Sequence, residues 1–408
     1  MPLDRLGRTL EGEVDALGEK GTAKGAEHVV TAVAPPEGAH GTRVFLEGEG
    51  DRPFIRMNSN SYLGMALREE VLGAEERAGR EYGAGPGAVR FISGTYAPHL
   101  ELEEALATFH GRTSGMIFSS AYAAVVGTLT PLITKATVVI SDALNHNSII
   151  NAIRLARPAG KEVYAHLGLE ELERAIERWK GRAERALVIT DGVFSMRGDH
   201  APLDEIMAIA RRHDDGYQEN VVVAVDDSHG VGAFGETGRG TEEASGSGPC
   251  DILVGTLGKA LGVNGGYLVS SAAVTAYLRE TAPFYIYSNP ITPGEAAAAR
   301  ASLQLLDSGE GRALLARLRG LTRRFEEGLV EHGFETIPGE HPIVPLVVRD
   351  TDRTRAIVGH LYDHGVLATG LAYPVVPAGD ETIRFQICAD HTEADIDRVL
   401  EILRNFRG

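Results

Sequence analysis

Hydrophobic residues follow two different periods along this chain. Near the N-terminus, apolar residues recur at spacings of three and four, which is the repeat of one face of an amphipathic helix. These residues are Leu3, Leu6, Leu10, Val14 and Leu17. The pattern predicts a helix whose apolar face packs on the body of the protein or on a second subunit. Residues 18–42 are rich in Gly, Ala and Pro, which is typical of a connector.

From about residue 53, short apolar runs alternate with longer segments of helical period. Several runs lack polar alternation, as expected of strands that are covered on both faces. The candidate strands are Gly115–Ser119, Thr137–Ser141, Ala186–Thr190, Val221–Val225, Ile252–Gly255 and Tyr267–Ser270. The candidate helices include Glu101–His110, Leu169–Arg182 and Leu203–His213. This alternation predicts an α/β fold with a mostly parallel sheet and helices on both of its faces.

The pattern changes again after Pro293. A long Ala-, Leu- and Arg-rich helical stretch leads to the apolar runs Ile343–Val348 and Thr382–Cys388, as in a smaller α+β domain. With 408 residues, the chain is long enough for two or three domains. We predict an N-terminal helix and connector over 1–52, a large domain over 53–293 and a small domain over 294–408.

The net charge of −17 makes nucleic acid and anionic membrane surfaces poor partners. Cys250 and Cys388 lie outside any CxxC spacing, so neither a disulfide framework nor a zinc knuckle is expected, and a reduced, cytoplasmic compartment is the default. Acidic residues interrupt the N-terminal segment, which argues against a signal peptide. No window approaches the 18 apolar residues of a membrane span.

Three short motifs imitate other kinds of site. Residues 230–235 spell GxGxxG after a candidate strand, but the Gly-rich stretch that follows cannot form the helix that a dinucleotide site needs. Gly258 and Lys259 resemble the end of a phosphate loop, but Ala260 stands where that motif requires Ser or Thr. His360 and His364 are four residues apart without a nearby carboxylate in the pattern, so we expect no metal site.

Polar residues gather where three candidate strands end. VVVAVDDSHG ends in Asp226 and His229, GTLGKALG carries Lys259, and LNHNSI carries His146. Open α/β sheets bind ligands at the carboxyl ends of their strands. Taken alone, Lys259 could be a surface lysine and Asp226 a strand cap, but their order and joint occurrence favour a shared site.

These residue types suit pyridoxal phosphate. A partly buried lysine can form a Schiff base, and small neighbours let a flat cofactor approach. A carboxylate such as Asp226 keeps a pyridine nitrogen protonated, so that the ring accepts electrons from a carbanion. The ring of His146 can stack on the cofactor. We therefore predict that Lys259 holds the cofactor and Asp226 pairs with its ring nitrogen.

The chain resembles a known family, the α-oxoamine synthases, which are fold-type I pyridoxal-phosphate enzymes. The resemblance extends from about Asn58 to Ile402. Within the family, the chain is most similar to glycine C-acetyltransferase, also called 2-amino-3-ketobutyrate CoA ligase. Its motifs are NSNSYLG, GAVRFISGT, SDALNHNSI, TDGVFSM, VDDSHGVGAFGETGRG, GTLGKALG, YSNPITP and RFQICADHT.

The resemblance implies roles around the cofactor ring. Lys259 would be the Schiff-base lysine and general base, and Asp226 the partner of the ring nitrogen. His229 and Ser195 would bond the ring hydroxyl, and His146 would stack on the ring. Lys259, His146, Asp226 and His229 thus form the expected catalytic set.

The resemblance also implies contacts beyond the ring. Backbone amides of Ala121 and Tyr122 and the Thr256 hydroxyl would hold the phosphate. Ser288 resembles the residue that each subunit contributes to the phosphate site of its partner, which implies a homodimer with shared active sites. The substrate carboxylate would be bound by two further residues, Arg384 and Asn60.

The implied reaction is a Claisen-type condensation of an amino acid, glycine, with an acyl thioester, acetyl-CoA. Lys259 removes the Cα proton, the carbanion attacks the thioester, and coenzyme A leaves. A synthase that uses a longer acyl-CoA or a carrier-protein thioester, an aminotransferase or lyase, and a catalytically silent scaffold are the alternatives. Four residues depart from the family pattern: Ala121, Val125, Asn147 and Arg197.

Overall fold

The computed structural model describes residues 3–23, 25–373 and 376–407. The chain forms two compact units. The small unit contains Met1–Ser59, Gly320–Gly339 and Ile343–Gly408, and the large unit contains Asn60–Arg319 and Glu340–Pro342. The large unit runs beyond the predicted boundary at residue 293, because α11 (Pro293–Leu306) packs against α2 (Glu69–Tyr82) and α3 (Ala97–Phe109).

The large unit contains a seven-stranded sheet in the order β4-β10-β9-β8-β7-β5-β6. Strands β5 to β9 pair in parallel, and only β10 runs antiparallel to both of its neighbours within this sheet. The mostly parallel α/β architecture and all six candidate strands are confirmed. The strands are β4 (Ser114–Phe118), β5 (Thr137–Asp142), β6 (Gly160–Tyr164), β7 (Arg185–Asp191), β8 (Val221–Asp226), β9 (Ile252–Thr256) and β10 (Gly266–Ser270).

Strand β6 was not predicted. It lies at the edge of the sheet and alternates half-buried and exposed residues, so it lacks the apolar run that marks the central strands. This edge position explains why its sequence, GKEVY, carries two charged residues.

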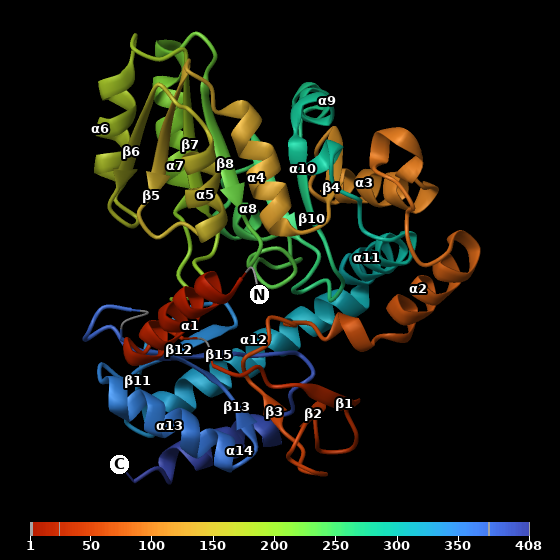
Figure 1. Ribbon diagram of the computed structural model, residues 1–408, viewed down its shortest axis with the longest axis vertical. Coiled ribbons are helices and arrows are strands. Elements are labelled where there is room, and N and C mark those ends of the chain that lie inside the picture. Colours follow the sequence, from red (N-terminus) through yellow and green to blue (C-terminus); the bar gives the residue numbers. More distant parts are fainter. Residues whose placement is uncertain (1–2, 24, 374–375, 408) are drawn as a thin grey trace. The chain divides into compact units, whose positions relative to one another are not determined.

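Helices flank the strands of the large sheet (Figure 1). Helix α4 packs against β9 and β10, α6 against β5 and β6, and α7 against β8. Apolar residues of α4 and α5 form a core with the sheet strands, including Val126, Ile149 and Val139. The remaining helices of this unit are α4 (Ala121–Leu132), α5 (Asn147–Leu155), α6 (Leu169–Trp179), α7 (Leu203–His213), α8 (Thr241–Ser245), α9 (Ala272–Thr281) and α10 (Pro283–Ile286).

The small unit contains a four-stranded antiparallel sheet in the order β11-β12-β15-β14. The two apolar runs predicted here form β12 (Ile343–Val347) and β15 (Thr382–Gln386). The other strands of this unit are β1 (Val30–Ala34), β2 (Arg43–Leu46), β3 (Ile55–Arg56), β11 (Glu335–Thr336), β13 (Val366–Leu367) and β14 (Thr369–Leu371). Its helices are α1 (Asp4–Glu19), α13 (Thr351–Asp363) and α14 (Glu393–Arg404), and α12 (Gly309–Glu331) crosses the boundary between the units along the chain.

The predicted N-terminal helix is confirmed as α1. Its five apolar residues remain between 46% and 68% exposed, so the described part of the chain does not cover this face. What the face packs against stays a prediction. None of the helices that the structure describes is long and apolar enough to cross a membrane.

Candidate active site

A pocket of about 170 Å³ lies in the large unit, where β7 and β8 end. Parallel strands place their carboxyl ends at the same edge of a sheet, which brings residues that are far apart in the sequence to one site. The pocket is lined by Ala121, Tyr122, His146, Ser148, Asp191, Val193, Ser195, Asp226, Ser228, His229 and Lys259. Lys259, the predicted Schiff-base lysine, and Asp226, the predicted partner of the ring nitrogen, therefore line the same pocket.

Asp226 is the last residue of β8 and is 9% exposed. Its register partner on β7 is Asp191, so two carboxyl groups end neighbouring strands. The Asp226 carboxylate accepts a hydrogen bond from the backbone N–H of Ser228 at 3.2 Å, which orients it at the turn that follows the strand.

His146 is the N-cap residue of α5, and its ring is fixed by Ser148. The ring Nδ1 accepts from the backbone N–H of Ser148 at 3.2 Å and lies 2.8 Å from the Ser148 hydroxyl. Burial lowers the pKa of His146; Asp226 opposes this shift and Lys259 adds to it. A lowered pKa favours a neutral ring, which suits stacking on an aromatic cofactor.

His229 is held on two sides by residues that the sequence had not singled out. Its Nδ1 lies 2.8 Å from the hydroxyl of Tyr62, and its carbonyl oxygen lies 2.8 Å from Nε2 of His341. Both partners are fully buried, and burial lowers the pKa of His341 to about 3. The NSNSYLG motif contains Tyr62, but His341 lies in no motif and carried no signal.

Lys259 lies in a tight loop after β9. The loop is closed by hydrogen bonds from the Gly262 N–H to the Lys259 carbonyl at 2.9 Å and from the Leu257 N–H to the Gly265 carbonyl at 3.0 Å. Gly232 packs against this loop at a φ of +80°, where an added Cβ would lie 2.5 Å from that of Ala260. The GxGxxG segment therefore owes one of its glycines to packing beside the lysine loop.

The N-terminus of α4 forms another wall of the pocket. The Ser120 hydroxyl caps this helix by accepting from the Ala123 N–H at 3.1 Å. The first N–H groups of a helix have no carbonyl partner within it, and they attract anions. Ala121 and Tyr122 stand at this position in the pocket wall, and β10 backs them, since a Cβ on Gly266 would lie 2.4 Å from Ala121.

Four predicted residues do not line this pocket. Thr256 ends β9, where its hydroxyl accepts from the Gly258 N–H at 3.1 Å. Asn60 accepts from the Tyr62 hydroxyl at 3.3 Å. The Ser288 hydroxyl donates to the Asn289 carbonyl at 3.4 Å, and Arg384 lies half-buried on β15 of the small unit. Their functional roles stay predictions.

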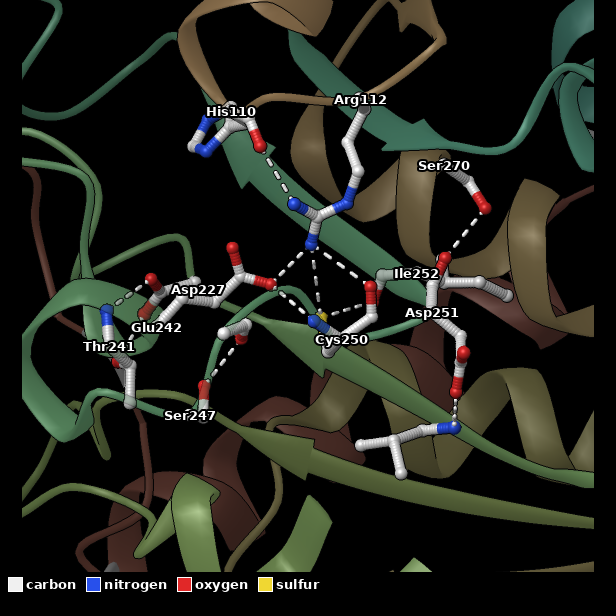
Figure 2. Close-up of polar contacts among 12 residues, drawn as sticks. His110, Arg112, Asp227, Thr241, Glu242, Ser247, Cys250, Asp251, Ile252 and Ser270 are labelled. Atoms are coloured by element: carbon white, nitrogen blue, oxygen red, sulfur yellow. Dashed lines mark hydrogen bonds and ion pairs between the residues drawn. The ribbon is translucent and has the colours of Figure 1, made fainter. Parts of the chain in front are cut away.

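Asp227 faces a polar network outside the pocket lining (Figure 2). This fully buried carboxylate accepts from the Thr241 N–H at 2.7 Å and from its hydroxyl at 2.6 Å. The adjacent Glu242 forms an ion pair with Arg112 and accepts from the Cys250 N–H at 2.7 Å. These hydrogen bonds hold Asp227 in place and so brace the turn that carries Asp226 and His229. Burial raises the pKa of Asp227 to about 7.

The pocket suits pyridoxal phosphate. Two of its buried polar atoms, the Ser228 hydroxyl and Asp191 Oδ1, have no hydrogen-bond partner among the described residues. An amine, a carboxylate, imidazoles and a helix N-terminus match an aldehyde, a pyridine ring and a phosphate. Among the described residues there is no cluster of three His, Cys, Asp or Glu residues that could hold a metal ion.

Comparisons with known proteins cover nearly the whole chain. Residues 52–403 match the family of class I and II aminotransferases. The chain is 39% identical to an 8-amino-7-oxononanoate synthase of Geobacter sulfurreducens over 96% of both proteins. It is 37% identical to the mitochondrial 2-amino-3-ketobutyrate coenzyme A ligase of Bos taurus, over 98% of this chain and 91% of that protein.

Solved structures show the same fold over the same extent. Serine palmitoyltransferase of Sphingomonas wittichii superposes with a TM-score of 0.88 at 29% identity, covering 98% of this chain and 97% of that one. A high-resolution structure of SPT with PLP superposes with a TM-score of 0.85 at 30% identity, covering 99% and 96%.

Proposed function

This chain belongs to the class I and II aminotransferase family and, within it, to the pyridoxal-phosphate-dependent α-oxoamine synthases, and from this premise we propose that it condenses glycine with acetyl-CoA. The product would be a 2-amino-3-oxo acid or the α-amino ketone left after loss of CO2. The observation that carries the proposal is the single pocket that gathers Lys259, Asp226, His146 and His229.

The choice of glycine and acetyl-CoA rests on local motifs. SDALNH, VDDSHGVG, GTLGKALG and GVLATGLAYPVVPAGDETIR resemble glycine C-acetyltransferase, although residues 374–375 of the last motif lie outside the described residues. Overall identity does not separate the substrates, because two of the relatives with different names match at 39% and 37%. A longer acyl-CoA or a carrier-protein thioester is therefore the alternative donor.

Pyridoxal phosphate, when bound, supplies an aldehyde that joins amines and a ring that accepts electrons from a carbanion. Lys259 would hold that aldehyde and, once displaced by the substrate amine, take the Cα proton as general base. The Asp226 carboxylate would keep the ring nitrogen protonated, and His146 would stack on the ring as a neutral imidazole. Hydrogen bonds from His229 and Ser195 would orient the ring hydroxyl.

The anionic groups would be bound away from the ring. The N–H groups of Ala121 and Tyr122, with the Thr256 hydroxyl, would hold the phosphate at the N-terminus of α4. Arg384 would bind the substrate carboxylate through two parallel hydrogen bonds, with Asn60 as a further contact.

We also propose that the enzyme is a homodimer. The support comes from apolar residues that remain exposed, which is typical of an interface. Phe91, Ile92 and Tyr287 are 65%, 64% and 78% exposed, and Tyr287 directly precedes Ser288, the residue proposed to reach the partner's phosphate site. Sedimentation of the purified protein tests this directly, and a monomer at micromolar concentration would contradict it.

The decisive experiment follows thiol release with glycine and a panel of acyl-CoA donors. We expect turnover with acetyl-CoA, and we expect Lys259→Ala to lose both turnover and the visible absorbance of the cofactor. Lys135→Ala, which changes a lysine outside the pocket lining, is the matched control and should keep both. If only longer acyl-CoA donors gave turnover, acetyl-CoA would not be the donor, and a longer acyl-CoA would take its place. Amino transfer to a 2-oxo acid without any thioester would favour an aminotransferase.

A further inference from the structure

Asp191 lines the cofactor pocket, yet none of the steps above uses it. It is 6% exposed and ends β7 beside the end of β8, where Asp226 is its register partner. We propose that Asp191 is a positioning residue that fixes His146 at the cofactor by accepting the hydrogen bond of its backbone N–H. The inference rests on the proposed role of His146 in stacking on the cofactor.

The hydrogen bonds form a reciprocal clasp between two segments. Asp191 Oδ2 accepts from the backbone N–H of His146 at 3.0 Å, and the side chain of Asn145 accepts from the backbone N–H of Asp191 at 2.8 Å. The Asn145 amide also donates to the Ile189 carbonyl at 2.8 Å. With Asn145 only 5% exposed, the loop before α5 is bound to the end of β7 without competition from water.

The clasp and the Ser148 contacts act on different parts of His146. The bond to Asp191 fixes the backbone, while Ser148 fixes the ring through Nδ1. The position of the ring depends on both contacts, because the side-chain rotamer set by Ser148 places the ring over the cofactor only if the backbone at His146 is also held at the pocket. Removing Asp191 should therefore move the ring without removing any group that the reaction needs.

The second oxygen of Asp191 supports a neutral carboxyl group. Burial, and next the Asp226 carboxylate, raise the pKa of Asp191 well above its usual value, against the opposing effects of the His146 N–H and Lys259. Because Oδ2 accepts from His146, the proton belongs on Oδ1, which is buried and has no partner among the described residues. A neutral Asp191 and an asparagine both present an acceptor oxygen on one side and a donor group on the other, although the amide has two N–H donors and the carboxyl group one O–H.

Two substitutions at position 191 separate the loss of hydrogen bonding from the loss of charge. Asp191→Asn keeps an acceptor for the His146 N–H and a donor on the other side, whereas Asp191→Leu keeps the branched shape, with larger methyl groups in place of the oxygens, and loses both. Asp251→Leu is the control, since the Asp251 carboxylate also accepts a backbone hydrogen bond, from the Val223 N–H at 2.7 Å, but belongs to an exposed residue outside the pocket lining.

The experiment titrates pyridoxal phosphate into the full-length apoprotein and records its Kd and the visible circular dichroism of the bound cofactor. We expect Asp191→Asn to stay within about threefold of the parent Kd, and Asp191→Leu to weaken it about tenfold or more with an altered dichroic band. Asn145→Ala removes the other half of the clasp and should alter the same dichroic band. It provides the test if Asp191→Leu does not fold.

A double-mutant cycle separates positioning from general stability. If Asp191 acts through His146, Asp191→Leu should add little to the Kd of a His146→Ala protein. Equal losses in both backgrounds, or a dichroic band that Asp191→Leu leaves unchanged, would overturn the proposal. Because no substrate is present, the result does not depend on glycine or acetyl-CoA, and a parent protein that binds no pyridoxal phosphate would instead contradict the proposed function.

Discussion

The hydroxyl of Tyr62 lies 2.8 Å from Nδ1 of His229, deep in the large unit. Tyr62 has a φ of +22°, in a region that residues other than glycine rarely adopt. Such a backbone costs on the order of 1–3 kcal/mol and persists only where the surrounding contacts hold it. Tyr62 is fully buried, and its ring packs edge-on against His341 at 5.4 Å between centroids. The protein thus accepts backbone strain at a residue that orients a proposed catalytic histidine.

Tyr62→Phe should test this orientation. The variant loses the hydrogen bond to His229 at 2.8 Å and the longer one to Asn60 at 3.3 Å, and it keeps the ring packing. We therefore expect kcat/KM to fall by about tenfold with little change in fold. Steady-state kinetics and the absorbance of the bound cofactor measure the effect. Tyr217→Phe is the matched control, because this buried tyrosine donates to the Ile176 carbonyl outside the pocket lining. Equal activity in both variants would show that the Tyr62 hydroxyl does not orient His229.

Asp227 should give the protein a pH-dependent stability. Burial, with smaller contributions from Glu242 and Asp226, raises its pKa from 3.8 to about 7, although hydrogen bonds from Thr241 oppose this. The folded protein therefore binds more protons than the unfolded chain between these values. The stabilisation from protonated Asp227 is complete below about pH 4 and is lost as the pH rises through about 7.

Asp227→Asn removes this titration, because asparagine is neutral throughout. Urea unfolding at pH 5 and pH 8 should show that the parent loses more free energy of unfolding over this interval than the variant does. The slope from one group is at most about 1.4 kcal/mol per pH unit. Parallel pH profiles for the two proteins would mean that Asp227 is ionised throughout this range.

His166 should make the stability depend on pH in the same direction as Asp227 does, but at higher pH. Burial acts to lower its pKa, but hydrogen bonds with Asp142 at 3.1 Å and Asp199 at 3.2 Å outweigh it and raise the pKa to about 9. Its contribution to stability is complete below pH 6.5 and is lost as the pH rises through about 9. We expect His166→Asn to lower the melting temperature at pH 7 and to have much less effect at pH 10. An equal fall in melting temperature at pH 7 and pH 10 would show that the substitution acts through packing and not through the charge of His166.

Asn147 directly follows His146 and contacts a residue of the pocket lining, Tyr122. The Tyr122 hydroxyl donates to the Asn147 side chain at 3.1 Å, and the Asn151 amide donates to that hydroxyl at 2.6 Å. We expect Asn147→Ala to remove one of these two hydrogen bonds of the Tyr122 hydroxyl and to raise kcat/KM for longer acyl-CoA donors severalfold relative to acetyl-CoA, because a polar contact beside the pocket is lost. Asn405→Ala, at the end of α14, is the control. An unchanged ratio would show that this contact does not select the donor.

Local sequence patterns were sufficient where one element decides the outcome. The central strands were predicted because their residues are buried on both faces, and α1 because its apolar residues keep helical spacing. Strand β6 was missed because an edge strand has no such run. The antiparallel direction of β10 also had no local signal, since direction depends on which neighbours the strand pairs with.

For the site, the sequence by itself determined which groups stand at the strand ends, because a strand, its last residue and the following turn are contiguous. Lys259, Asp226, His146 and His229 were all found in this way, and they share one pocket. Only the tertiary structure decided what holds them. The pairs Asp191–His146 and Tyr62–His229 join segments separated by 45 and 167 residues, and hydrogen bonds of this kind depend on strand register and loop packing, which no local pattern encodes.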